Sequence, residues 1–123
     1  MRTNKSRGWW TKERQQYAYD RLTQEAGLSD AGAKGLISRW SKVEAPAGPT
    51  ASNSITGGHR GIAQWGKSRS KGLPANADFS VQIDHAIAEL NGKEKKAGDL
   101  LRDAQTMEEG AIGASAYERA EGY

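Results

Sequence analysis

The stretch that decides the fold is DAGAKGLISRWSKVEA, residues 30–45. Its apolar residues recur every three or four positions, the spacing of one face of an α-helix; they are Ala33, Leu36, Ile37, Trp40 and Val43. Ser29 is placed to cap the helix at its start, while Pro46 and Pro49 end it. The stretch therefore predicts an amphipathic helix over residues 30–44 whose apolar face packs against the rest of the chain.

Similar periodicity predicts further helices on both sides, over residues 12–26, 62–71, 78–90 (or from 76), 93–103 and 106–117. Thr11 is placed to cap the first of these, and Gly27 to end it in the left-handed conformation. Thr106 and Glu109 are spaced as a capping box for the last helix. No alternating strand pattern is present. The predicted fold class is all-α, a single small helical domain with a long polar loop from residue 46 to residue 59.

Length and composition fit one domain. A chain of 123 residues is long enough for one hydrophobic core, to which four Trp and four Tyr contribute bulk. Without cysteine, neither a disulfide nor a thiolate metal site can form. No apolar run is long enough to span a bilayer. The charged start, MRTNKSRGWW, leads into no apolar stretch, so a cleaved secretory signal is not expected.

The charge pattern bears on the partners. Residues 1–10 are expected to form a flexible basic arm ending in a Trp pair, ahead of a compact domain over residues 11–123. The net charge of +3 suits an anionic polymer of any kind. Basic and acidic residues alternate through most of the chain, which is typical of solvated helix faces. A nucleic-acid-binding module built on the arm is an alternative, but no recognition motif supports it, so nucleic acid is not an expected partner.

Glu44 is the acidic residue best placed for chemistry. It follows Trp40 by four residues and Ile37 by seven, which puts it on the apolar face at the end of its helix. A carboxyl group withdrawn from water keeps its proton to higher pH, as a general acid requires. A solvent-exposed residue in a fraying last turn fits the same position, and helix geometry leaves both interpretations open.

The segment GGHRGIAQW, residues 57–65, holds the candidates for substrate contact. Its glycines allow the backbone to approach a ligand closely. The amide of Gln64 can donate and accept hydrogen bonds to a sugar, and Trp65 offers a flat face for stacking. A loop-to-helix junction with one core tryptophan is the competing interpretation. His59 and Ser54 lie in the same loop region and are further candidates; the two histidines of the chain do not indicate a metal site.

Four stretches of the chain, in order, resemble the phage tail lysozyme family: LTQEAGLSDAGAKGLISRWSKVEA, GIAQWGKSRSKGL, QIDHAIAEL and AYERA. Together with their flanks they extend over residues 17–119. The family belongs to the lysozyme-like superfamily, with goose-type lysozymes and soluble lytic transglycosylases. The resemblance implies a lysozyme-like helical fold in which the long loop lines a substrate cleft.

The same resemblance implies roles for individual residues. Glu44 corresponds to the family's catalytic glutamate and Gln64 to the glutamine that lines its sugar cleft. Trp65 and Arg69 occupy the family's next tryptophan and arginine positions. Tyr117 begins the C-terminal Tyr-Glu-Arg motif, for which a structural or cleft-lining role is expected.

This sequence departs from the family pattern around the glutamate. Ala45 stands where the family has a serine, and Ser38-Arg39-Trp40 replaces its usual glycine-asparagine pattern. The loop after Glu44 contains no acid, and Asp78, Asp84 and Glu89 are candidates for a second carboxylate. A non-catalytic structural or ejection protein of the virion that keeps the lysozyme-like fold is therefore the alternative to an enzyme.

As an enzyme, the protein is expected to cleave the MurNAc–GlcNAc β-1,4 bond of bacterial peptidoglycan during cell-wall penetration, with Glu44 as general acid and no metal or other cofactor. A lone glutamate fits lytic transglycosylation, in which the 6-hydroxyl of the substrate closes an anhydro ring. Hydrolysis, as by a muramidase with water positioned by Gln64 or Ser54, stays open. The expected location is the phage virion, acting in the host periplasm or cell wall, with other virion or tail proteins as partners.

Overall fold

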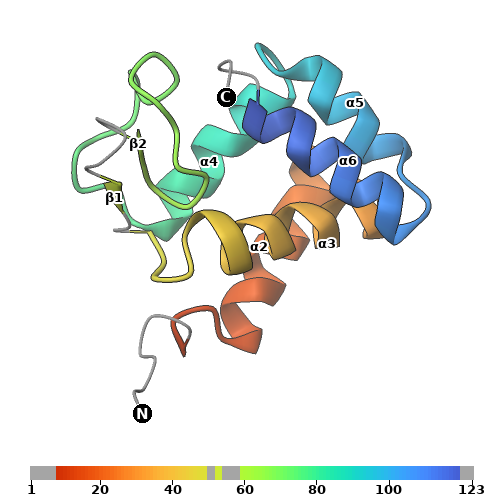
Figure 1. Ribbon diagram of the computed structural model, residues 1–123, viewed down its shortest axis with the longest axis horizontal. Helices are drawn as coiled ribbons and strands as arrows, with labels where there is room; N and C mark the ends of the chain where they lie inside the picture. The colour runs from red at the N-terminus through yellow and green to blue at the C-terminus, as the bar shows by residue number, and fades with distance from the viewer. Residues whose placement is uncertain (1–7, 50–51, 54–58, 120–123) are drawn as a thin grey trace.

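The computed structural model of the chain describes residues 8–49, 52–53 and 59–119. In chain order the elements are α2 (Lys12–Glu25), α3 (Asp30–Arg39), the π-helical turn η1 (Trp40–Glu44), β1 (Ser52–Asn53), β2 (His59–Arg60), α4 (Phe79–Leu90), α5 (Lys95–Asp103) and α6 (Met107–Glu118). Figure 1 shows the two short strands on the left, α5 and α6 on the right, and α4 running between them. The predicted all-α class is confirmed for these residues. The small antiparallel sheet was not expected.

The helix starts are where the capping residues place them. The side chains of Thr11, Ser29, Asp78 and Thr106 each accept a hydrogen bond from a backbone N–H in the first turn of the helix that follows. Gly27 follows α2 with a φ of 70°, the left-handed conformation expected of it. Glu109 bonds back to the N–H of Gln105, one residue before the cap. Local sequence therefore sets most of the helix boundaries.

Helices α3 and α6 lie in direct backbone contact because glycines face each other. A Cβ atom added to Gly35 would lie 2.6 Å from the carbonyl carbon of Gly110, and one added to Gly110 would lie 2.3 Å from the oxygen of Ala31. Further along, Arg39 reaches Ser115 and Trp40 reaches Glu118. The contacts advance along both helices in the same direction. The carboxyl ends of α3 and α6 therefore meet.

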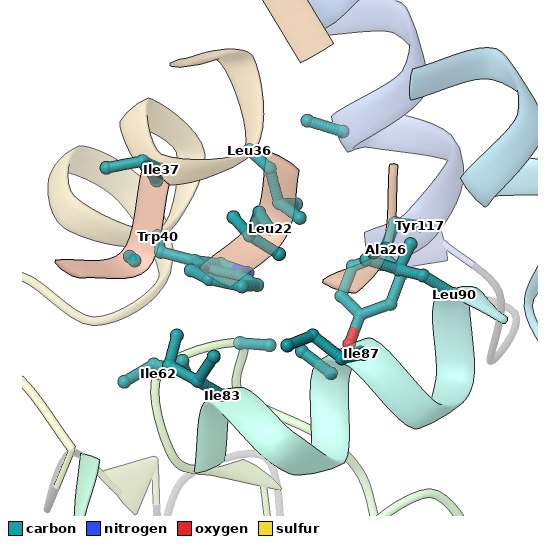
Figure 2. Close-up of a cluster of buried hydrophobic side chains, with 14 of the residues drawn as sticks. Leu22, Ala26, Leu36, Ile37, Trp40, Ile62, Ile83, Ile87, Leu90 and Tyr117 are labelled. Atoms are coloured by element: carbon teal, nitrogen blue, oxygen red, sulfur yellow. The ribbon is translucent and has the colours of Figure 1, made fainter. Parts of the chain in front are cut away.

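The core is centred on Trp40, whose side chain is fully buried. Figure 2 shows its ring between Leu22 of α2 and the aliphatic side chains of Ile62 and Ile83. The ring of Tyr117 lies edge-on to it, with 6.4 Å between centroids. The residue that begins η1 is thus fixed by packing from α2, α4 and α6.

The central helix changes geometry before its end, which was not expected. The regular α-helix stops at Arg39, and the next turn closes with a bond from the N–H of Ala45 to the oxygen of Trp40 at 2.8 Å, five residues apart. In this wider turn each residue rotates less about the axis. Val43, predicted on the buried face, is consequently 61% exposed, so that prediction is wrong.

The predicted helix over residues 62–71 is also wrong, because the segment forms a series of turns. Side chains from elsewhere hold its backbone. The guanidinium of Arg60 donates to the carbonyl oxygens of Ser70, Leu73 and Pro74. The side-chain oxygen of Gln82, on α4, accepts from the N–H of Ile62 at 2.8 Å. These long-range bonds replace the backbone bonds that a helix would make.

The expected arm does not extend to residue 10. Trp10 is 6% exposed and belongs to the core, and Trp9 packs edge-on against both Trp10 and Phe79. The arginine of α2 at position 14 lies over the Trp9 ring, 4.4 Å from its centroid. The Trp pair is thus part of the domain, and residues 1–7 lie outside the described part of the chain.

Candidate active site

Glu44 is the last residue of η1, and its carboxyl group is almost enclosed by protein. Its side chain is 7% exposed, and its Oε2 accepts a hydrogen bond from Nε of Arg39 at 2.8 Å. The wide turn that exposes Val43 brings Glu44 inward. The Glu44 side chain is thus buried, which is one of the two interpretations that helix spacing left open, and it is not a frayed, exposed residue.

Arg39 connects Glu44 to the end of α6. While its Nε donates to Glu44, a terminal nitrogen donates to Oγ of Ser115 at 3.1 Å. The planar guanidinium fixes both directions at once. The orientation of the Glu44 carboxylate is therefore tied to the packing of α6 on α3.

A second buried carboxyl group lies at the end of α6, and it was not predicted from the sequence as a site residue. Glu118, the last residue of α6, is 3% exposed, and its Oε2 accepts from the indole N–H of Trp40 at 3.1 Å. It was noted only as part of the Tyr-Glu-Arg motif. The available signal was the spacing of four residues from Gly110 to Ala114 to Glu118, which places this acid on the buried face of its helix.

The environment of Glu118 favours its protonated form. Burial and, next in size, the negative charge of Glu44 raise its pKa from 4.5 to about 9. The positive charges of Arg69 and Arg39 and the bond from Trp40 oppose this shift without cancelling it. At neutral pH the end of α6 therefore presents a neutral carboxylic acid close to Glu44.

The chain after Glu44 is anchored by the N-terminal tryptophans. The indole N–H of Trp10 donates to the carbonyl oxygen of Ala45 at 2.8 Å. Gly48 has a φ of 96°, and a Cβ atom there would lie 2.4 Å from the Trp9 ring. Since only glycine fits such a backbone and such a contact, the turn after Glu44 is built around the Trp pair.

Gln64 lies in a strained turn. Its φ of 53° is rare for a residue with a side chain, and it is the only non-glycine residue with positive φ among those described. Bonds between the backbones of Arg60 and Trp65 close the turn, and the Gln64 amide donates to the oxygen of Gly61 at 2.9 Å. Strain of this kind persists where the surroundings enforce it, often at functional sites. Gln64 is 9% exposed.

Trp65 and Tyr117 lie in the core. Trp65 is 1% exposed and its indole N–H lies 3.0 Å from Glu89 and 2.9 Å from the hydroxyl of Tyr117, which itself donates to Glu89 at 2.7 Å. The flat face expected of Trp65 for sugar stacking is not available at that exposure. Of the two roles expected for Tyr117, full burial fits the structural one.

Arg69 completes the polar cluster around Glu89. It donates twice to Glu89, at 2.8 and 3.0 Å, and once to the carbonyl oxygen of Tyr117. Although burial opposes its charge, the Glu89 carboxylate helps to raise the pKa of Arg69 above its ordinary value. The four side chains Arg69, Glu89, Tyr117 and Trp65 therefore form a hydrogen-bonded cluster, with the Glu94 carboxylate 4.0 Å from Nε of Arg69.

The candidates for a second carboxylate are engaged elsewhere. Asp78 caps α4, Asp84 pairs with Arg21, and Glu89 pairs with Arg69. His59, predicted to contact substrate, pairs with Asn53 in the small sheet and is half-buried. Ser54 lies outside the described residues.

The surface beside Arg39 is hollowed. A groove of about 630 Å³ between α3 and α6 is bordered by Arg39 and Ser115, with Lys34, Lys42 and Val43 among the other residues that line it. Two of its other borders are Met107 and Ala111, so the wall is partly apolar. The groove leads along α3 to the residue that orients Glu44.

In residues 8–49, 52–53 and 59–119, no three histidine, aspartate or glutamate side chains gather as a metal-binding group. None of the helices so described has the length and apolar character needed to cross a bilayer.

The fold and the site define a small helical domain with two buried carboxyl groups where its central and last helices end. The phage tail lysozyme family matches residues 13–123, and the chain belongs to this family. It is thus a phage lysozyme-like domain directed at the bacterial cell wall. Comparison with curated proteins and with solved structures gives no significant match.

Proposed function

We propose that the protein cleaves the MurNAc–GlcNAc β-1,4 bond of peptidoglycan, with Glu44 as the general acid. The observation that carries the proposal is the position of Glu44: a carboxyl group with a 7% exposed side chain, oriented by Arg39, at the end of the central helix. Membership of the phage tail lysozyme family supports the substrate class.

In this proposal Glu44 gives its proton to the oxygen of the glycosidic bond as that bond breaks. The carboxylate that remains is already paired with the guanidinium of Arg39, which stabilises the charge formed. Glu44 then acts as base toward the next nucleophile. With the 6-hydroxyl of the substrate the product is an anhydro sugar, and with water it is a reducing end; we favour the anhydro product.

Contacts to the sugar are proposed for Gln64, His59 and Ser54. The amide of Gln64, held in its strained turn, is suited to hydrogen bonding with a hydroxyl or acetamido group. Trp65 and Tyr117 support the site from inside the core rather than touching substrate, because both are buried. The phage particle is proposed to carry the protein to the periplasm or wall, in contact with other virion or tail proteins.

The test is digestion of purified peptidoglycan by wild type and by Glu44→Gln, with the products identified by mass spectrometry. Glu13→Gln, on an exposed part of α2, is the matched control. Wild type and Glu13→Gln are expected to release muropeptides with anhydro ends, and Glu44→Gln is expected to release almost none. Reducing ends in place of anhydro ends would overturn the transglycosylase preference only.

The competing function is a non-catalytic virion component, which Ala45 in place of serine favours. In the structure this alanine is fully buried and its carbonyl oxygen holds the Trp10 indole. Folded wild-type protein that releases no fragments at any pH from 4 to 9 would favour this function and contradict the proposed one.

A further inference from the structure

We propose that the groove between α3 and α6 binds the peptide stem of peptidoglycan, whose carboxylate groups pair with Lys34 and Lys42. This inference rests on the proposed function of Glu44 and names the part of the substrate that lies beside the cleaved bond. It adds contacts to the peptide, separate from the contacts proposed for the sugar.

The first argument is the position of the groove. Arg39 and Ser115 both line it and are joined by a hydrogen bond of 3.1 Å, and the same arginine donates to Glu44 at 2.8 Å. In peptidoglycan the stem is attached to the lactyl group of MurNAc, next to the bond that Glu44 is proposed to cleave. A stem that leaves the sugar beside Glu44 can therefore enter the groove at its Arg39 end.

The second argument is the length of the groove. Its border begins at Asp30, where α3 begins, and continues to Val43 of η1. A helical stretch of that length rises by about 20 Å. An extended stem of four or five residues spans about 14–17 Å, at roughly 3.4 Å per residue. The groove is thus long enough to hold the whole stem.

The third argument is the charge along the groove. Lys34 and Lys42 both line it, about 10–12 Å apart along the helix axis. Asp30 lines it too and pairs with Lys34 at 3.1 Å, but the two side chains are 62% and 69% exposed, so this pair is weak. A peptide stem carries carboxylates on its second residue and at its end. Two lysines placed apart along the groove can each bind one of them.

The fourth argument is the apolar part of the wall. Val43, which the π-helical turn directs outward, borders the groove near Glu44 and is 61% exposed. Met107 borders it at the start of α6 and is 89% exposed, and Ala111 follows one turn later. Exposed apolar side chains with a polar rim are typical of binding surfaces. Lysines beside small apolar contacts suit a peptide rich in alanine that carries carboxylates.

A second hollow competes for the same lysines. Lys34 and Lys42 also border a smaller space of about 370 Å³ between α2 and α3, together with Lys12. Arg39 and the residues of α6 line the groove but not this hollow. Of the two spaces, the groove is the one connected through Arg39 to Glu44, and we assign the stem to it.

The first test measures binding and does not depend on activity. Protein labelled with ¹⁵N is titrated with the synthetic stem peptide N-acetyl-L-Ala-γ-D-Glu-L-Lys-D-Ala and, separately, with the same peptide amidated at both carboxyl groups. Millimolar amounts of the first peptide are expected to shift the backbone NMR signals of Lys34 and Ser38 on α3 and of Ala111 and Ser115 on α6. The amidated peptide should shift them much less, because it cannot form the ion pairs.

The matched variants of this test remove two exposed lysines each. Lys34→Gln/Lys42→Gln should bind the stem peptide about threefold to tenfold more weakly, the loss expected of two exposed ion pairs. Lys93→Gln/Lys96→Gln, around the start of α5, should bind it as wild type does. Equal binding by the first variant and wild type, or unshifted signals on α6, would overturn the proposal; shifts confined to α2 would place the peptide in the smaller hollow instead.

The second test compares two substrates, intact peptidoglycan and glycan strands from which an amidase has removed the stems. Wild type is expected to cleave the strands that carry stems faster. Lys34→Gln/Lys42→Gln should lower the ratio of the two rates about threefold or more, and Lys93→Gln/Lys96→Gln should keep it.

The outcomes separate this inference from the proposed function. Cleavage of both substrates at one rate, without binding of the peptide, would refute the inference and leave the role of Glu44 standing. Binding of the peptide in the groove without cleavage of either substrate would refute the proposed function alone.

Discussion

Two buried polar clusters occupy this small domain, and they differ in the groups that bind their carboxyl side chains. In the first, the carboxylate of Glu89 meets Arg69, Tyr117 and Trp65, and every contact is a hydrogen bond of 2.7–3.0 Å. In the second, Glu44 accepts a hydrogen bond from the guanidinium of Arg39, and Glu118 accepts one from the indole N–H of Trp40.

The difference indicates that the Glu89 cluster supports the fold, whereas the Glu44 site is the candidate for chemistry. A carboxylate with a full set of donors is stable as it is and has no reason to exchange a proton. Glu118, whose pKa burial raises to about 9, favours its protonated form at neutral pH. Family membership directs attention to the end of the central helix, and the burial of the Glu44 and Glu118 side chains there supports the proposed role of Glu44.

The largest effect is expected from breaking the cluster around Glu89. Arg69→Ala leaves the Glu89 carboxylate buried without its cation, which should lower the free energy of unfolding by about 3–5 kcal/mol. Urea unfolding at pH 7, followed by circular dichroism, measures it. A loss below about 1 kcal/mol would mean that this cluster is not a structural support.

An effect of opposite sign is expected at Glu118. The folded-state pKa of Glu118 lies near 9, above its ordinary value of 4.5, so its contribution to stability is complete below pH 4.5 and is lost as pH rises toward 9. Glu118→Gln removes the cost of ionisation. It should stabilise the protein at pH 8 by about 2–4 kcal/mol and flatten the dependence of stability on pH.

Urea titrations of wild type and Glu118→Gln at pH 5 and pH 8 make the comparison. The gap between the two proteins should be small at pH 5 and large at pH 8. An equal gap at both values would show that Glu118 ionises in the folded protein as it does in the unfolded chain.

The sequence predicted what local chemistry determines. Thr11, Ser29 and Thr106 cap their helices because a side-chain oxygen satisfies N–H groups within the same turn. Such signals need no knowledge of the rest of the chain. Most helix starts followed from them, whereas helical spacing left the burial of Glu44 open.

What the sequence did not predict depends on distant groups. The α-helical pattern continues through residues 40–44, and the wider turn appears only once α2, α4 and α6 pack around Trp40. The segment after Arg60 has helical spacing but is held by side chains from other parts of the chain. Glu118 meets the Glu44 site only because α3 and α6 pack in parallel through glycines.

The smallest stability effect is expected at the support of the turn after Glu44. Trp10→Phe keeps an aromatic ring but removes the bond to Ala45, which should cost about 1 kcal/mol of unfolding free energy. Cleavage should fall by more than this loss of stability explains, since the end of η1 is no longer fixed. The matched control is Trp9→Phe, which keeps the edge-on ring packing. Equal rates for both variants would contradict a role of Trp10 in orienting Glu44.

The most direct test of the account is the initial rate of soluble fragment release from peptidoglycan at pH 7 by wild type, Glu13→Gln and Glu44→Gln, each shown to be folded by its thermal transition. The account predicts that Glu44→Gln is about 10²–10⁴-fold slower than wild type, the contribution of a general acid, while Glu13→Gln is unchanged. A folded Glu44→Gln protein that works within about tenfold of the wild-type rate would contradict the assignment of Glu44.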